Sequence, residues 1–143
     1  MYHRVSFLEI QLRNLHVIAN LFWIGSIVSV GLLVALPLGA ARERGALARA
    51  LYTKLAVPAF LISFLAAAVR LVSDLNYYFV ATHWMHAKLP LALGVIALHH
   101  VLGARARRLA DGSRKDGGPA GVLTAVLAVL AVGSAWLALG KPF

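Results

Sequence analysis

Residues 15–38, LHVIANLFWIGSIVSVGLLVALPL, form an apolar stretch without a single charged side chain. At about 1.5 Å per residue, a helix of this length is roughly 36 Å long, which is enough to cross a bilayer with some tilt. Three further apolar stretches follow, at residues 55–73, 84–104 and 119–140. None of the four alternates between apolar and polar residues as a membrane β-strand would. The sequence therefore predicts an all-α membrane protein, with four transmembrane helices in an antiparallel bundle that forms a single domain over residues 1–143.

The composition supports a membrane environment. Of the 143 residues, 61% are hydrophobic and 13% are charged, whereas soluble domains have about a quarter charged residues and just under half apolar ones. A soluble globule and a disordered chain are both excluded, and a lipid bilayer is the expected partner. The absence of cysteine excludes disulfides, thiolate metal sites and a cysteine nucleophile.

The basic residues predict the topology. The net charge is +9, and 9 of the 14 Lys and Arg residues fall in the connections at 39–54 and 105–118. In a soluble protein this excess would suggest nucleic acid, but beside membrane spans it marks cytoplasmic loops, so no nucleic-acid partner is expected. Both termini and the aromatic connection at 74–83 then face outward. A signal peptide over residues 1–41 is the alternative, but its core would exceed the usual 7–15 residues, so we expect a retained span.

Ionisable residues within the apolar stretches are candidate functional groups, because they are costly to place in lipid. His16 lies about one turn inside the first span, Lys88 about one turn inside the third, and Arg70 with Asp74 at the end of the second. In an antiparallel bundle, all of these fall at the same level on the side of the termini. His16, Arg70 and Lys88 are therefore predicted to share one site.

The helical repeat separates the remaining candidates. At 100° per residue, Lys88 and His99 share a face, while His86 and Lys88 point in nearly opposite directions. A regular helix therefore cannot present His86 and Lys88 to the same metal ion. His99 and His100 lie near the predicted cytoplasmic end of the third span.

Each candidate also has a structural explanation. His16 could hydrogen-bond to a neighbouring carbonyl, and Lys88 could extend toward the membrane interface. Arg70 and Asp74 could form an i,i+4 ion pair. His99 and His100 could be plain interface residues. Trp23 and Trp136 are expected to face lipid or to pack.

Haem is the cofactor that these residue types favour. Neutral imidazole is the usual proximal ligand of haem iron, an amine can also ligate once it has lost its proton, and a four-helix bundle offers a slot for a flat macrocycle. Arg70 or the histidines near the border, His83 and His86, could then meet the propionates. A copper site is disfavoured because soft sulfur ligands are nearly absent.

The same residues carry a resemblance to a known family. The segment Trp84-Met85-His86-Ala87-Lys88-Leu89, followed by an apolar run to His99-His100, resembles the third-span motif of the HemJ family of bacterial protoporphyrinogen oxidases, which is related to the membrane domain of CopD copper-resistance proteins. Leu15-His16-Val17-Ile18, with Trp23 and Gly25, resembles the first-span motif. The ending Lys141-Pro142-Phe143 is similar to the family's usual carboxyl terminus.

The resemblance implies a small multi-pass enzyme of the bacterial inner membrane that binds haem b. It would oxidise protoporphyrinogen IX to protoporphyrin IX, removing six electrons and six protons. His16 and Lys88 match the family positions associated with haem ligation and activity, so both are expected to bind the metal. His86 matches the motif's histidine and is expected, with Lys88, to be catalytic. His16, Lys88 and Arg70 are the expected cofactor-binding residues.

The chain departs from the family pattern in two places. Pro37 is followed by Leu38-Gly39-Ala40-Ala41 instead of a segment that contains a histidine, and the Asn-Glu-any-Pro segment before the fourth span is replaced by residues 113–120. The resemblance is therefore to a divergent member. The alternative function is a haem-binding protein without catalysis, or a structural subunit of a larger membrane complex or homo-oligomer.

Overall fold

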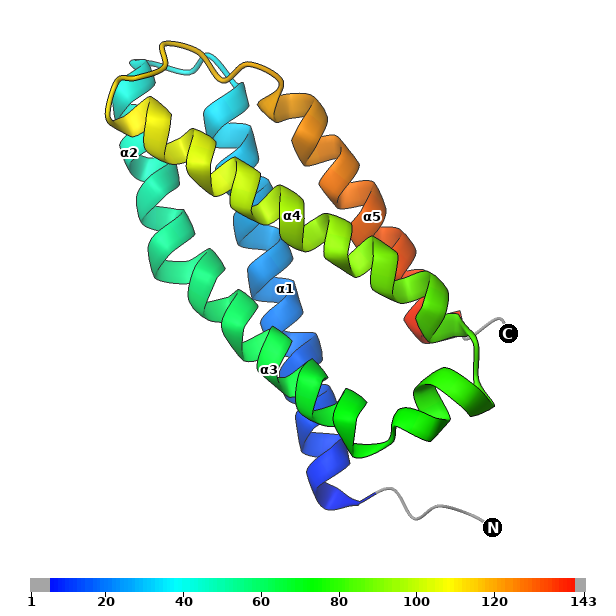
Figure 1. Cartoon of the computed structure of the whole chain (residues 1–143). Helices are drawn as coiled ribbons and strands as arrows, with labels where there is room; N and C mark the ends of the chain where they lie inside the picture. The colour runs from blue at the N-terminus through cyan, green and yellow to red at the C-terminus, as the bar shows by residue number, and fades with distance from the viewer. Residues whose placement is uncertain (1–5, 141–143) are drawn as a thin grey trace.

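The computed structural model describes residues 6–140, and the regular elements of this part of the chain are all helical (Figure 1). The α-helices are α1 (Phe7–Ala35), α2 (Ala41–Leu51), α3 (Val57–Ser73), α4 (Trp84–Ala110) and α5 (Ala120–Gly140), and two π-helical turns are η1 (Tyr52–Ala56) and η2 (Tyr77–Ala81). Because α2, η1 and α3 follow without a break, they form one helical run. Four helices or helical runs are long and apolar enough to cross a membrane. The predicted all-α, four-span fold class is confirmed.

Helix α1 begins eight residues before the apolar stretch that predicted it. The Ser6 hydroxyl accepts a hydrogen bond from the Glu9 backbone N–H at 3.2 Å, and the Glu9 carboxylate accepts one from the Ser6 N–H at 3.0 Å. This capping box satisfies two N–H groups that would otherwise lack partners, so the helix starts in a polar segment. The helix ends at Ala35, because Leu36 precedes Pro37 and is extended.

The connection expected over residues 39–54 is helical from Ala41 onward. In α2, Arg42 and Arg49 are exposed, while Gly45 and Ala48 are buried, and α2 packs against α4. A Cβ atom at residue 45 would lie only 2.3 Å from the Ala110 backbone nitrogen, so the two helices approach too closely for a side chain there. Because α2 buries small residues instead of large apolar ones, its sequence carries little hydrophobic signal.

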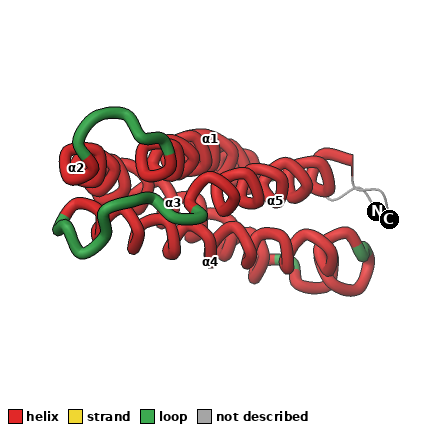
Figure 2. Tube along the Cα trace, turned by 90° about the horizontal axis from the view of Figure 1, so that it is seen from above, coloured by secondary structure: helices red, strands yellow, loops and turns green. Residues whose placement is uncertain are grey.

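The helices pack as two antiparallel pairs that are close together at one end. Helix α1 packs along α3, α4 packs along α5, and α2 joins the pairs by packing on α4 (Figures 1 and 2). The first turn of α1, the η2 turn and the end of α5 all lie at the opposite end, where Figure 1 shows the pairs diverging. We call this the open end, and we call the end that carries α2 and the α4–α5 connection the basic end.

The hydrophobic core is concentrated toward the basic end. Its largest fully buried side chains include Ile27, Leu102, Leu109 and Leu127. A second, small cluster of Tyr78, Trp84 and Met85 lies at the open end. Between these clusters, α4 buries no residue from 86 to 94 and α5 buries none from 128 to 136. This loosely packed level is where α4 carries Lys88.

Candidate functional site

His16 is held in a closed hydrogen-bond network between α1 and α3. Its Nδ1 lies 2.9 Å from the Ser63 carbonyl oxygen and 3.0 Å from the Ser63 hydroxyl, and its Nε2 lies 3.0 Å from the Asn20 amide nitrogen. The Ser63 hydroxyl donates to the Asn20 side-chain oxygen at 2.7 Å. Ser63 is buried and the other two residues are half-buried. The structure thus contains the carbonyl contact that was the structural explanation for His16.

The network determines which nitrogen of His16 carries the proton. A carbonyl oxygen can only accept, so Nδ1 is the protonated nitrogen and donates to Ser63. The Asn20 oxygen is occupied by the Ser63 hydroxyl, so the Asn20 amide nitrogen faces Nε2 and donates to it. The Nε2 atom of His16 therefore presents its lone pair. Metal-ligating histidines usually have this arrangement, with the second ring nitrogen donating to a carbonyl or carboxylate.

The charges of Lys88 and Arg70 act on the same ring. Both side chains exert an electrostatic effect on His16, and the charge of Arg70 also acts on Lys88. The Lys88 ammonium lies 5.6 Å from the centre of the Trp84 ring, and Arg70 donates to the Tyr78 hydroxyl at 3.1 Å. The three residues that were predicted to share one level are thus within electrostatic range of one another, on α1, α3 and α4.

Tyr78, which lies between the second and third spans, anchors Arg70. Burial raises the pKa of the Tyr78 hydroxyl, and the nearby positive charge of Arg70 partly offsets this effect. The phenol is therefore neutral at physiological pH and accepts the Arg70 hydrogen bond. Asp74, the expected ion-pair partner of Arg70, accepts a hydrogen bond from the Tyr77 backbone N–H at 3.0 Å.

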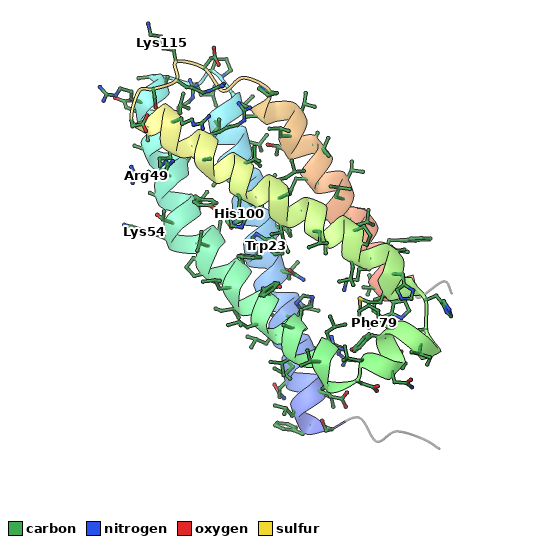
Figure 3. The ribbon with its side chains drawn as sticks, in the orientation of Figure 1. Trp23, Arg49, Lys54, Phe79, His100 and Lys115 are labelled. Carbon is green, nitrogen blue, oxygen red and sulfur yellow. The ribbon has the colours of Figure 1, made fainter. Side chains whose placement is uncertain are left out.

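His86 lies apart from this group. It is exposed, and its ring neighbours are Phe79 at 5.6 Å and His83 at 5.9 Å. Phe79 lies near the open end of the molecule (Figure 3). Lys88, two residues later, is half-buried, so the two residues differ in exposure as expected from a helix that turns them to different faces.

A second polar group, centred on His99, lies in the middle of the bundle. His99 is 0% exposed, and its Nδ1 accepts a hydrogen bond from the Trp23 indole at 3.1 Å. Its ring packs between those of Tyr52 and Phe60, with centroids at 4.9 and 5.1 Å. The expectation that His99 is a plain interface residue is wrong, because α4 continues to Ala110 and places His99 well inside the helix. Trp23 packs as expected.

The indole of Trp23 also restricts the chemistry of His99. An indole N–H can only donate, so Nδ1 of His99 is the accepting nitrogen and a neutral ring carries its proton on Nε2. Among the described residues, Nε2 has no hydrogen-bond partner. His99 in this arrangement cannot offer its Nε2 lone pair to a metal. His100, its neighbour, is exposed, and its Nδ1 lies 3.4 Å from the Tyr52 hydroxyl (Figure 3 labels Trp23 and His100).

Asn20, Ser63 and Tyr52 were not predicted as site residues. Asn20 follows His16 by four residues and so shares its helix face, which is a usable signal. Ser63 and Tyr52 contact the histidines across 47 and 48 residues of sequence. Only the packing of the helical run Ala41–Ser73 on the rest of the bundle reveals these partners.

The described residues contain no group of three or more His, Cys, Asp or Glu side chains that could hold a metal ion. A bare ion bound by protein ligands alone is therefore unsupported in residues 6–140. A haem iron needs only one or two protein donors. His16 fits that requirement through its oriented ring and its Nε2 lone pair, provided that the Asn20 amide turns away.

The space around His16 places a second condition on a macrocycle. Two concavities of the described chain lie at the basic end, and neither is lined by His16 or Lys88. A macrocycle beside His16 would have to occupy the level where α4 and α5 bury no side chains. The His16 ring is a donor of the kind that haem iron takes, and neither of these two concavities lies beside it.

No family model, curated protein or solved structure matches the chain. The resemblance to the HemJ family thus depends on the motifs around His16 and Lys88. The Lys141-Pro142-Phe143 ending lies outside the described residues. Any function for the chain has to be argued from these motifs and from the geometry of the site.

Proposed function

We propose that the chain is a haem b-binding protein of a bacterial inner membrane that oxidises protoporphyrinogen IX to protoporphyrin IX. The observation that carries this proposal is the His16 ring, which is fixed by a backbone carbonyl and shares its surroundings with two basic side chains. The porphyrinogen would lose six electrons and six protons, and a separate membrane oxidant, such as a quinone, would take the electrons. Haem b, when bound, supplies a redox-active iron within the bilayer.

In this proposal His16 is the iron ligand. Its Nδ1–H is bonded to the Ser63 carbonyl, which fixes the ring orientation, and Nε2, now bonded to the Asn20 amide, is the atom that would hold the iron. Ser63 contacts both His16 and Asn20, because its carbonyl accepts the His16 Nδ1–H and its hydroxyl donates to the Asn20 side-chain oxygen. Asn20 and Ser63 therefore position the ligand without touching the iron themselves.

Lys88 and Arg70 act as binders of carboxylates. The Lys88 nitrogen lies over the face of Trp84, and this cation–π contact offsets part of the cost of burying a charged ammonium group. A charged amine has no lone pair for iron, so Lys88 is better suited to a propionate of the cofactor or substrate. Arg70, held by the Tyr78 hydroxyl, offers a second cation to the same kind of group. His86, the third residue of the motif, is exposed at the open end, apart from these two cations.

The test is the absorption spectrum of the detergent-purified protein made under haem-replete conditions. We expect a Soret band for the wild type, its near-complete loss in His16→Ala, and its retention in Lys88→Ala with a lower activity. His100→Ala removes an exposed histidine from a different group and serves as the matched control. A wild-type protein without a Soret band would refute haem binding.

Complementation of a porphyrinogen-oxidase mutant tests the reaction separately. If the wild-type chain restores growth of the mutant and Lys88→Ala does not, the result supports the proposed oxidase activity. A haem-loaded protein that fails to complement would refute the oxidase and leave a haem-binding subunit without catalysis. That alternative is favoured by one observation: in the segment after Pro37, where the family pattern has a histidine, this chain has only Leu38-Gly39-Ala40-Ala41.

A further inference from the structure

The connection between α4 and α5 brings two guanidinium groups to one point. Gly118 has φ +53°, and a Cβ atom built on it would lie 3.0 Å from Nη1 of Arg105 and 3.2 Å from Nη1 of Arg114. Two like charges this close to one point repel each other unless an anion lies between them. The glycine carries no side chain and so lets both guanidinium groups approach the turn, where a bridging anion would offset their repulsion.

The nearby carboxylates offset only part of this positive charge. The Asp116 carboxylate lies 3.8 Å from the same point and accepts the Gly118 N–H at 3.0 Å. The Asp111 carboxylate accepts hydrogen bonds from the Ser113 N–H and hydroxyl, which lower the pKa of Asp111. Each carboxylate therefore caps a turn of the connection. The buried Nε of Arg105 has no hydrogen-bond partner among residues 6–140.

A concavity beside the two arginines adds more positive charge. It has a volume of about 330 Å³, and Arg114 lines it together with Arg42 and Lys115, with the single carboxylate of Asp111 opposite. The side chain of Lys115 projects outward at this end of the molecule (Figure 3). A headgroup larger than a phosphate therefore has space and further cations on the Arg114 side of the cluster.

The lengths of the helices place this cluster at the membrane surface. Helix α5 has 21 residues, which corresponds to about 30 Å and matches the hydrocarbon thickness of a bilayer. Its first residue, Ala120, is then at the edge of the hydrocarbon, and Gly118 lies at headgroup depth. Arg105, in the last turns of α4, reaches the same level.

We propose that Arg105 and Arg114 bind the phosphate of an anionic phospholipid headgroup beside Gly118. The neighbouring concavity accommodates the rest of the headgroup, and the acyl chains extend into the bilayer along the helices. The site is separate from the His16 group and does not depend on haem binding.

The test is native mass spectrometry of the full chain with phosphatidylglycerol or phosphatidylcholine. At about 0.5 M salt the diffuse attraction between surface charges is largely screened, so we expect one retained phosphatidylglycerol per chain and no retained phosphatidylcholine. The R105Q/R114Q variant should bind phosphatidylglycerol roughly tenfold more weakly or worse, because it loses two charge-assisted hydrogen bonds to the phosphate. The R107Q/R108Q variant removes two exposed charges from the same helix and should retain the lipid.

Arg105 also donates to the Gly117 carbonyl at 3.3 Å, so its removal could disturb the turn. Arg114→Gln leaves that hydrogen bond intact and should still weaken lipid binding severalfold. Equal losses in R105Q/R114Q and R107Q/R108Q would show only general surface attraction and would overturn the proposal. Displacement of the lipid by millimolar inorganic phosphate would also overturn it, because the site would then be one for free anions.

Discussion

The two ends of the bundle differ in how closely the helices pack and in which side chains they bury. At the basic end, small residues such as Gly45 and Ala48 allow helices to come close, and large apolar side chains fill the remaining core. At the open end, the helix pairs diverge, and half-buried polar side chains occupy the level below the core (Figure 1). The basic end is thus held by close helix contacts, whereas the open end leaves polar side chains half-buried between diverging helices.

A substitution that disturbs the close contact between α2 and α4 at the basic end should lower the stability most. Even the methyl group of Gly45→Ala would meet the α4 backbone, with 2.3 Å to the Ala110 nitrogen and 2.5 Å to the Leu109 carbonyl carbon. We expect a loss of about 1–3 kcal/mol, since backbone atoms cannot move aside as a side chain can. Thermal unfolding in detergent measures it. Gly25→Ala is the matched control, because a Cβ there meets nothing within 4 Å. Equal melting temperatures for the two variants would contradict the comparison.

The buried hydrogen bond between Trp23 and His99 should give the next largest effect. Trp23→Phe keeps an aromatic ring but removes the N–H that Nδ1 of His99 accepts. Leaving a buried acceptor unpaired costs about 1–3 kcal/mol, and no other polar group pairs with the His99 ring in the described residues. Trp136→Phe changes a residue that is 64% exposed and should alter the unfolding temperature little. Equal unfolding temperatures for Trp23→Phe and Trp136→Phe would show that the hydrogen bond from Trp23 to His99 does not contribute to stability.

The smallest effect is expected at the open end and depends on pH. Because burial raises the folded-state pKa of Tyr78, its contribution to stability is complete below about pH 10 and is lost as the pH rises through the folded-state value. Tyr78→Phe should lower stability by about 1 kcal/mol at neutral pH through the lost Arg70 hydrogen bond. The gap to the wild type should then narrow above pH 10. Unfolding curves at pH 8 to 11 test this, and a constant gap would contradict it.

The four spans and the basic end could be predicted because they depend on composition along the chain. A run of twenty apolar residues identifies a transmembrane helix without any knowledge of its neighbours. The level shared by His16, Arg70 and Lys88 could also be predicted, since depth follows from position within a span. The helix over Ala41–Leu51 could not, because it buries small residues beside exposed arginines.

The sequence by itself determined the class of the protein, its four apolar helices and the positions of the ionisable residues along them. Only the tertiary structure decided which side chains face each other. Within a helix that is apolar on every side, no face is marked as interior, so the burial of His99 against Trp23 and Tyr52 was not predictable. The same holds for Ser63, which determines the tautomer of His16 from a helix 47 residues away. These contacts depend on the approach and rotation of helices, which hydropathy along the chain does not record.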